Sequence, residues 1–347
     1  MGIDPAFATV VFRCIRRCYL THLTSTIMIY IGIDVSKDSF VAAYPAQSGY
    51  TTKTFKNTSN GVHEFITSLP ADSHCVMEAT GNYSMLLLYL LQTAGKPVSM
   101  ENSQKIKHFS RAMLSVTKTD EIDAKMIALY GEKMNPKPYK IPAESILFLK
   151  QKRTVLRQLK KQLTATRNLQ EALSVLPMQD PKSKTTVEQT IQFLKDQIAA
   201  MEKEITNLSN QEYRRQMEVL TSLKGIGETV ASALITATGG FTYFRNAKQI
   251  SRYLGLCPTY QQSGTSINIK GHINRNGDSY LRSQLYVAAI ASIRCNDQCK
   301  ETYKKLRERG KAGRVAIIAV ANKLIRIAFA LVTKNQKYNM EHTPVLA

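Results

Sequence analysis

Apolar residues in the first third of the chain fall in short runs rich in β-branched and aromatic residues, which is typical of sheet strands. The first run places Ile31, Gly32 and Ile33 directly before Asp34, and a later run ends its apolar part in Glu78. The expected strands are residues 29–35, 39–44, 51–57, 74–79 and 97–101. The first three predict an antiparallel meander, and the two acids are expected where their strands leave the sheet.

Segments whose apolar residues recur at helical spacing lie between and after the later strands. The expected helices are residues 61–69, 83–94, 103–114 and 120–133. Three strands followed by alternating helix and strand is the order of a ribonuclease H-like α/β fold, in which acids at strand ends meet on one side of a mixed sheet. Residues 28–134 are therefore predicted to form one domain, and the three prolines of residues 135–142 predict a linker.

A two-helix arm is expected over residues 143–215, with a break around residues 177–181. Its second helix repeats apolar residues at alternating spacings of four and three, which is the seam of a coiled coil. The seam consists of Val187, Ile191, Leu194, Ile198, Met201, Ile205 and Leu208. It fits an antiparallel hairpin within one chain and also a dimer arm, and both readings stay open because they can coexist.

The rest of the chain predicts a mostly α-helical C-terminal domain over residues 216–335. The expected helices are residues 228–238, 241–254, 278–295 and 313–333. Residues 255–272 are polar and interrupted by glycines, so we expect a loop, and the basic residues 304–314 predict a solvated turn or a phosphate contact. Residues 1–27 are interpreted as a flexible leader or expression remnant foreign to the fold, and residues 336–347 as a tail.

Four carboxylates are candidates for a metal site. Asp120 and Asp123 are three residues apart at the start of a predicted helix, so both can face the same way and converge with Asp34 and Glu78. Like charges a few ångström apart repel one another unless a cation neutralises them. Hard divalent cations take oxygen ligands, so Mg²⁺ is the expected cofactor, and two such ions would bracket a phosphodiester.

A glycine turn in the C-terminal domain predicts a contact with nucleic acid. Gly225 and Gly227 precede a predicted helix and follow Lys224. A turn of this kind exposes backbone N–H groups that bind phosphate, and it is typical of a helix-hairpin-helix element, which grips the DNA backbone. The alternative is a tight turn into an ordinary helix.

Hydroxyl and cationic side chains gather in the polar stretch that follows. Ser263 lies within it, and Lys270, His272 and Arg275 come shortly after. Hydroxyls flanked by cations fit a phosphate site, or a nucleophile that attacks phosphate while the cations stabilise the developing charge. From composition alone, an ordinary surface loop is the favoured alternative.

Charge and composition narrow the class of partner. The formal net charge is +21, from 47 Lys and Arg against 26 Asp and Glu, which favours a polyanion, most commonly nucleic acid. No eighteen-residue apolar run is present, since Lys323 and Arg326 interrupt residues 315–332, so a buried or DNA-facing helix is expected there and no membrane span. The six cysteines form no disulfide framework and fit a reducing cytoplasm.

Six short motifs together resemble the DEDD-type transposases of bacterial insertion sequences, which are described as bridge-RNA-guided recombinases. The motifs are residues 30–34, 78–83, 118–124, 225–227, 255–258 and 262–264. The resemblance covers nearly the whole chain after the leader and implies a RuvC-like N-terminal domain with metal-binding acids. Those acids fall on Asp34, Glu78, Asp120 and Asp123. It also implies a catalytic serine at Ser263, with Ser266 as the fallback.

The resemblance implies a mechanism and a set of partners. Mg²⁺ would polarise the scissile phosphate, and Ser263 would attack it to form a phosphoserine link to DNA before strand exchange. Donor and target DNA, a guide RNA from the element itself and a homodimer or homotetramer are the implied partners. Two alternatives stay open: a Holliday-junction-type metal endonuclease that uses water as nucleophile, and a non-catalytic DNA-bridging protein.

Overall fold

The structure, a computed structural model, describes residues 28–114, 119–263, 267–273 and 277–339, and for residues 259–263 and 267–273 it describes the backbone alone. The chain divides into two compact units, Met1–Ile141 and Pro142–Ala347. Each unit has its own hydrophobic core, as the separate clusters of buried residues show. The two units are described separately below.

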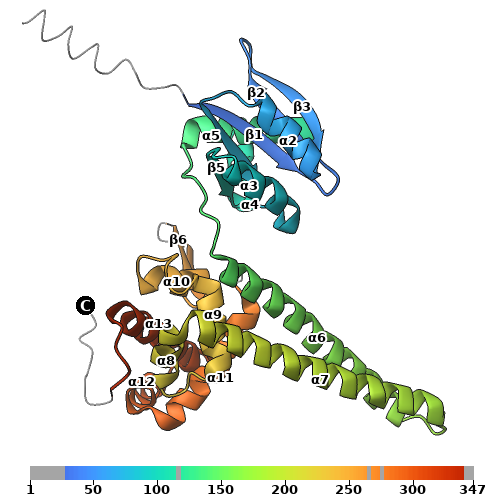
Figure 1. Cartoon of the computed structure of the whole chain (residues 1–347). Helices are drawn as coiled ribbons and strands as arrows, with labels where there is room; N and C mark the ends of the chain where they lie inside the picture. The colour runs from blue at the N-terminus through green and yellow to red at the C-terminus, as the bar shows by residue number, and fades with distance from the viewer. Residues whose placement is uncertain (1–27, 115–118, 264–266, 274–276, 340–347) are drawn as a thin grey trace, which may run out of the picture. The chain divides into compact units, whose positions relative to one another are not determined.

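A five-stranded mixed sheet forms the centre of the N-terminal unit, in the order β3-β2-β1-β4-β5 (Figure 1). The strands are β1 (Ile29–Val35), β2 (Ser39–Pro45), β3 (Tyr50–Lys56), β4 (Ser73–Glu78) and β5 (Val98–Glu101). The first three pair antiparallel, whereas β1, β4 and β5 pair parallel. This mixed sheet is confirmed, and it is compatible with a ribonuclease H-like domain.

Helices cover both faces of this sheet. They are α2 (Ser59–Ser68), the 3₁₀ helix η1 (Gly81–Ser84), α3 (Met85–Thr93), α4 (Ser103–Ala112) and α5 (Asp120–Met134). Ile31 and Ile33 of β1 pack into the cluster that includes Phe65 of α2 and Leu88 of α3. Because side chains alternate along a strand, the residues between them face the opposite side, where α5 lies.

The arm is an antiparallel pair of long helices within one chain, α6 (Glu144–Ser174) and α7 (Pro181–Glu212). Of the predicted seam, Ile191, Leu194, Ile198 and Ile205 are buried. The Asp180 side chain accepts a hydrogen bond from the Ser183 backbone and starts α7 at Pro181, after the expected break. The hairpin reading is therefore what the structure describes, and the dimer reading stays a prediction.

The remaining helices of the C-terminal unit pack around one core (Figure 1). They are α8 (Arg214–Ser222), α9 (Glu228–Thr238), α10 (Ala247–Tyr253), α11 (Ser279–Cys295), α12 (Asp297–Glu308) and α13 (Gly313–Lys334). Helix α13 is long and apolar enough to cross a membrane by length and composition. However, Val320, Leu324 and Ala328 are buried in the core, and the Lys323 ammonium donates hydrogen bonds to Gln298 and Thr302 of α12.

Three local predictions are wrong. Residues 255–272 are not a loop throughout, because β6 (Pro258–Ser263) and β7 (Ile267–Ile273) pair antiparallel across them. The helix expected at 241–254 is confined to α10, since Phe241 has a positive φ of 70° and cannot continue a helix. The basic residues 304–314 are a turn only in part, because α12 continues through Glu308.

Candidate active site

The register of the N-terminal sheet places Asp34 and Glu78 at the same end of neighbouring strands. Ile33 of β1 is paired with Met77 of β4 in the parallel ladder, so the next residue on each strand is one of these acids. Both side chains are half-buried. Because Gly32 and Val76 lie against α5 and side chains alternate, Asp34 and Glu78 also face α5.

Helix α5 runs opposite to β1 and brings its first turn to the level of Asp34. Gly131, near the end of α5, lies against Tyr30, whereas Ala124 lies against Gly32. Two residues along a strand cover about 6.6 Å, and one turn back along the helix covers about 5.4 Å. Continuing that progression, Asp120, one turn before Ala124, is predicted to lie at the level of Asp34.

Asp123 lies on the line of α5 residues next to the one that contains Asp120 and Ala124. It lies one turn before Ile127, which packs with Val76 of β4, so Asp123 is on the β4 side of the helix and toward Glu78. Thr119 fixes the start of this helix, because its hydroxyl accepts a hydrogen bond of 3.2 Å from the Ile122 backbone. The strand register therefore puts Asp34 and Glu78 at one end of the sheet, and the convergence of Asp120 and Asp123 with them stays a prediction.

The donor set at this end fits a hard divalent cation, since all four side chains offer carboxylate oxygens. In the part of the chain that the structure describes, no three His, Cys, Asp or Glu side chains are grouped closely enough to hold a metal ion as they stand. Mutual repulsion separates carboxylates that share one site, and a bound cation removes that repulsion. The chemistry of the four carboxylates thus fits a divalent cation, whereas the grouping of the described side chains in this structure is too loose to hold one.

Asn57 joins the two segments that follow the strands of Asp34 and Glu78, and sequence reasoning missed it. Its amide nitrogen donates hydrogen bonds of 3.0 Å to the Ser36 carbonyl, just after β1, and to the Tyr83 carbonyl, in η1 after β4. A single Asn after a strand carries no pattern that would reveal this role. We interpret Asn57 as a positioning residue for Asp34 and Glu78.

Glu101 is a neighbouring acid that the sequence did not propose. It pairs with Glu78 in the ladder between β4 and β5, and the Lys105 ammonium donates to its carboxylate at 2.7 Å. This hydrogen bond raises the pKa of Lys105, and burial opposes part of the rise. The carboxylate of Glu101 is therefore neutralised by Lys105 of α4.

The predicted serine belongs to the other unit. Ser263 is the last residue of β6, and its backbone pairs with Ile267 across the hairpin. Lys270 and His272 lie on β7, where His272 pairs with Thr259, and the side chains of all three predicted residues lie outside the described part. Arg275 and the fallback Ser266 fall outside the described residues altogether.

The glycine turn before α9 is closely packed on one side and open on the other. Gly225 has a φ of 102°, and a Cβ atom there would lie 1.8 Å from the Ser292 hydroxyl, which itself donates to the Lys224 carbonyl. Gly227 starts α9 without a side-chain cap, and a Cβ atom there would meet nothing within 4 Å. The exposed Lys224 and this helix start suit a phosphate, although Glu228 brings one negative charge to the same turn.

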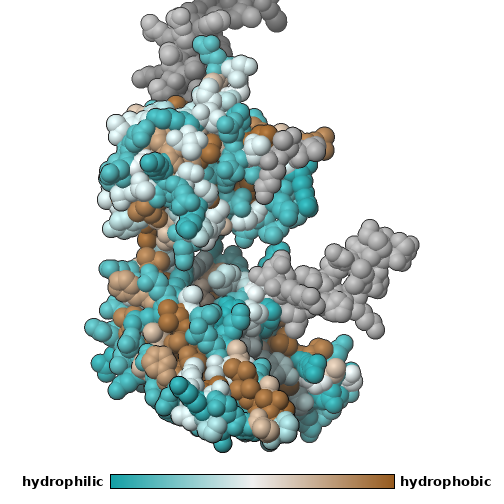
Figure 2. Space-filling model, turned by 90° about the vertical axis from the view of Figure 1, so that its right-hand side faces the viewer, coloured by the Kyte–Doolittle hydropathy of each residue, from teal (hydrophilic) through white to brown (hydrophobic). Residues whose placement is uncertain are grey.

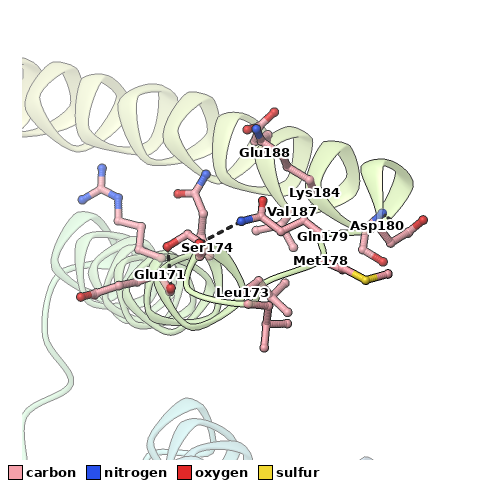
Figure 3. Close-up of a pocket in the computed structure, with 13 residues that line it drawn as sticks. Glu171, Leu173, Ser174, Met178, Gln179, Asp180, Lys184, Val187 and Glu188 are labelled. Atoms are coloured by element: carbon pink, nitrogen blue, oxygen red, sulfur yellow. Dashed lines mark hydrogen bonds between the residues drawn. The ribbon is translucent and has the colours of Figure 1, made fainter.

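The end of α6 and the start of α7 line a cavity of about 650 Å³, and none of the predicted site residues lies in it (Figure 3). The Gln179 side chain donates to the Ser174 carbonyl across its floor at 2.8 Å. Acids outnumber cations in its lining, with Glu171, Asp180 and Glu188 against Arg167 and Lys184. This cavity therefore has no excess positive charge for a phosphate.

Comparison with known proteins gives matches to both units. Residues 217–304 match the family described as Transposase IS116/IS110/IS902 family, and residues 31–177 match the DEDD family of IS110, described as Transposase. The chain is 30% identical to a pilin gene-inverting protein of Moraxella bovis over 319 residues, which is 89% of this chain and 97% of that protein. It is 31% identical to the transposase for insertion sequence element IS1111A of Coxiella burnetii over 34% of this chain and 33% of that protein.

Proposed function

The chain belongs to the IS116/IS110/IS902 family of DEDD transposases and is a DNA recombinase, and we propose that it cuts and rejoins DNA through a serine nucleophile acting with a metal-bound cluster of acids. The observation that supports the proposal is that Asp34 and Glu78 lie at the same end of neighbouring parallel strands, with α5 packed on the same face of the sheet. The other two acids, Asp120 and Asp123, lie in the first turn of α5.

A divalent cation, which we propose to be Mg²⁺, would be held by these four carboxylates and would supply positive charge to a phosphodiester. The Ser263 hydroxyl oxygen attacks the scissile phosphorus, losing its proton to solvent, while the bond from phosphorus to the leaving deoxyribose oxygen breaks and that oxygen takes up a proton. The phosphoserine so formed keeps one phosphoester bond for rejoining. A hydroxyl of another strand then attacks the same phosphorus and releases Ser263.

The acids and Ser263 belong to different units, so the reaction needs both units at one phosphate. We propose that two or four copies assemble for this step and that the arm takes part. The buried seam of α7 packs within its own chain, so contacts between copies would use the apolar residues that the arm leaves exposed. Those with at least half of their surface exposed are Leu169, Val175, Met178 and Phe193.

The partners in this proposal are donor and target DNA and a guide RNA in the bacterial cytoplasm. The net charge of +21 supports a large nucleic-acid interface. Lys224, Gly225 and Gly227 would hold DNA backbone as a helix-hairpin-helix element, with Lys270, His272 and Arg275 near the serine. The relative from Moraxella bovis is called a gene-inverting protein, and inversion, like transposition, requires cutting and rejoining of strands.

Cleavage of element-end DNA, with and without co-purified RNA, tests this function. We expect cleavage in Mg²⁺ to be lost in EDTA and in Asp34→Asn. Asp38→Asn makes the same change on the exposed turn after β1 and should leave cleavage intact, which controls for altered charge. Cleavage that survives in Asp34→Asn would contradict the metal site, and a non-catalytic bridging protein would show no cleavage at all.

A further inference from the structure

The C-terminal unit contains a second, strongly basic cavity. It has a volume of about 320 Å³ and lies between α6, α9, α10 and the start of α11. Among its lining residues are Lys150, Arg153, Arg157, Tyr253, Asp278 and Tyr280. The three cations are spaced by three and four residues on α6, so they share one face of that helix.

Among the described residues that line this cavity, three cations are accompanied by one carboxylate, that of Asp278. Among the ion pairs of the described residues, none involves Lys150, Arg153 or Arg157. By contrast, Lys152 and Lys160 of the same helix pair with glutamates of α7. Three cations against the single carboxylate of Asp278 leave a charge of +2 in the lining.

That carboxylate is already engaged. Asp278 caps α11 and accepts hydrogen bonds of 2.9 and 3.1 Å from the Tyr280 and Leu281 backbones. Arg153 is half-buried and donates to the Gln284 side chain at 3.3 Å. Burial lowers the pKa of the Arg153 guanidinium, and the nearby Tyr280 and Asp278 oppose that shift. A cation withdrawn from water without a counter-ion is costly, so an entering anion would stabilise this face.

Aromatic rings hold the other two cations in place. The Arg157 guanidinium lies 5.9 Å from the centre of the Tyr280 ring, and the Lys150 ammonium lies 5.6 Å from the centre of the Tyr243 ring. Such contacts restrict a long cationic side chain without neutralising its charge. The cavity is therefore a positively charged site whose cations are partly ordered in advance.

Two residues that line this cavity, Tyr253 and Asp278, lie on either side of the β6–β7 hairpin in the sequence. Tyr253 ends α10 shortly before β6, and Asp278 starts α11 shortly after β7. The two ends of that segment meet, because a Cβ atom on Gly277 would lie only 2.5 Å from the Leu254 carbonyl carbon. A group bound in the cavity would thus be anchored at the base of the hairpin that carries Ser263.

We propose that this cavity binds one phosphodiester group of a nucleic acid. Arginine forks match phosphate oxygens in pairs, and Lys150 adds a point charge. The proposal rests on the proposed function only for the source of the phosphodiester, which is DNA or RNA rather than free phosphate. It assigns to α6 a role in substrate binding in addition to its place in the arm.

Equilibrium binding in EDTA tests the site without any strand cleavage. Labelled duplex DNA, single-stranded DNA and RNA are titrated by fluorescence anisotropy across a series of salt concentrations. For the double variant Lys150→Gln/Arg157→Gln we expect affinity to fall about tenfold or more on the bound probe. The slope of the logarithm of the binding constant against the logarithm of the salt concentration should become shallower by about 0.9 on duplex DNA or 0.7 on single strands. A change of that size corresponds to the loss of one phosphate contact.

Lys161→Gln is the matched control, since it removes an exposed cation from the same helix outside the cavity and should leave the slope unchanged. Circular dichroism melts check that each variant is folded. Slopes and affinities equal to those of the wild type on all three probes would overturn the proposal. The proposal would also be overturned if inorganic phosphate raised the melting temperature of the wild type alone while the double variant bound nucleic acid as the wild type does. The binding measurement in EDTA does not depend on cleavage by the acid or serine variants. The proposed cavity and the proposed cleavage mechanism can therefore each be refuted without the other.

Discussion

Gly32 of β1 lies in backbone contact with Ala128 of α5: a Cβ atom on Gly32 would be 2.1 Å from the Ala128 nitrogen and 2.2 Å from the Ala124 oxygen. No side chain fits between the strand and the helix at this point. The contact fixes how closely α5 approaches the strand that carries Asp34. Gly32 is thus a structural requirement of the candidate metal site.

Replacing Gly32 by Ala should displace α5 from the sheet. We expect the free energy of unfolding to fall by about 3 kcal/mol, because the clash is with backbone and no side chain can rotate away. Metal-dependent cleavage should fall further than the folded fraction does, since Asp120 and Asp123 move with the helix. Urea denaturation and the cleavage assay measure the two effects.

Gly49→Asn is the control for that substitution. Gly49 has a φ of 82°, which Asn tolerates, and a Cβ atom there would meet nothing within 4 Å. We expect a loss below about 1 kcal/mol and normal cleavage. Equal losses in the two variants would show that the approach of α5 to Gly32 does not matter.

Thiol alkylation should separate the cysteines by burial. Burial raises the pKa of the Cys75 thiol to about 12 and that of Cys299 to about 11. At pH 8 the reactive thiolate of Cys75 is then about one part in ten thousand, and it increases only as pH rises toward 12. Cys295 is exposed and should be alkylated first. Peptide mass spectrometry after timed iodoacetamide treatment checks the order, and equal rates for Cys75 and Cys295 would refute the buried packing of β4.

Binding to element DNA should depend steeply on salt. Lys and Arg exceed Asp and Glu by 47 − 26 = 21, and each phosphate contact releases counter-ions on binding. With six to ten such contacts, affinity should fall by about three orders of magnitude or more between 50 and 200 mM salt. Filter binding measures this dependence, and a flat response would argue against an extended nucleic-acid interface.

The sequence predicted the N-terminal unit well because its signals are local. β1 shows its apolar run directly, and the Thr119 cap marks the start of α5 within about one residue. The same signals identified the end of the strands as the place of the acids. The closeness of Asp34 to α5, in contrast, depends on Gly32 and Ala128, which are distant in sequence.

The C-terminal unit was harder to predict because its key features depend on tertiary partners. The strand β6 is polar, and β7 alternates isoleucines with polar residues over only seven positions, so their pairing with each other was not evident from an apolar run. The basic residues of α6 were not singled out from the sequence, since only the fold brings Tyr280 against Arg157. Hydrophobic periodicity does not contain that information.

The central claim is that Ser263 becomes linked to DNA at a phosphate beside the divalent cation that the four acids would hold. The direct measurement is mass spectrometry of protein trapped on element-end DNA with its co-purified RNA in Mg²⁺, then denatured and digested. We expect a nucleotide remnant on the peptide that contains Ser263, and no adduct in Ser263→Ala or Asp34→Asn. Normal strand cleavage by Ser263→Ala without any adduct would contradict the account and indicate a metal nuclease that uses water.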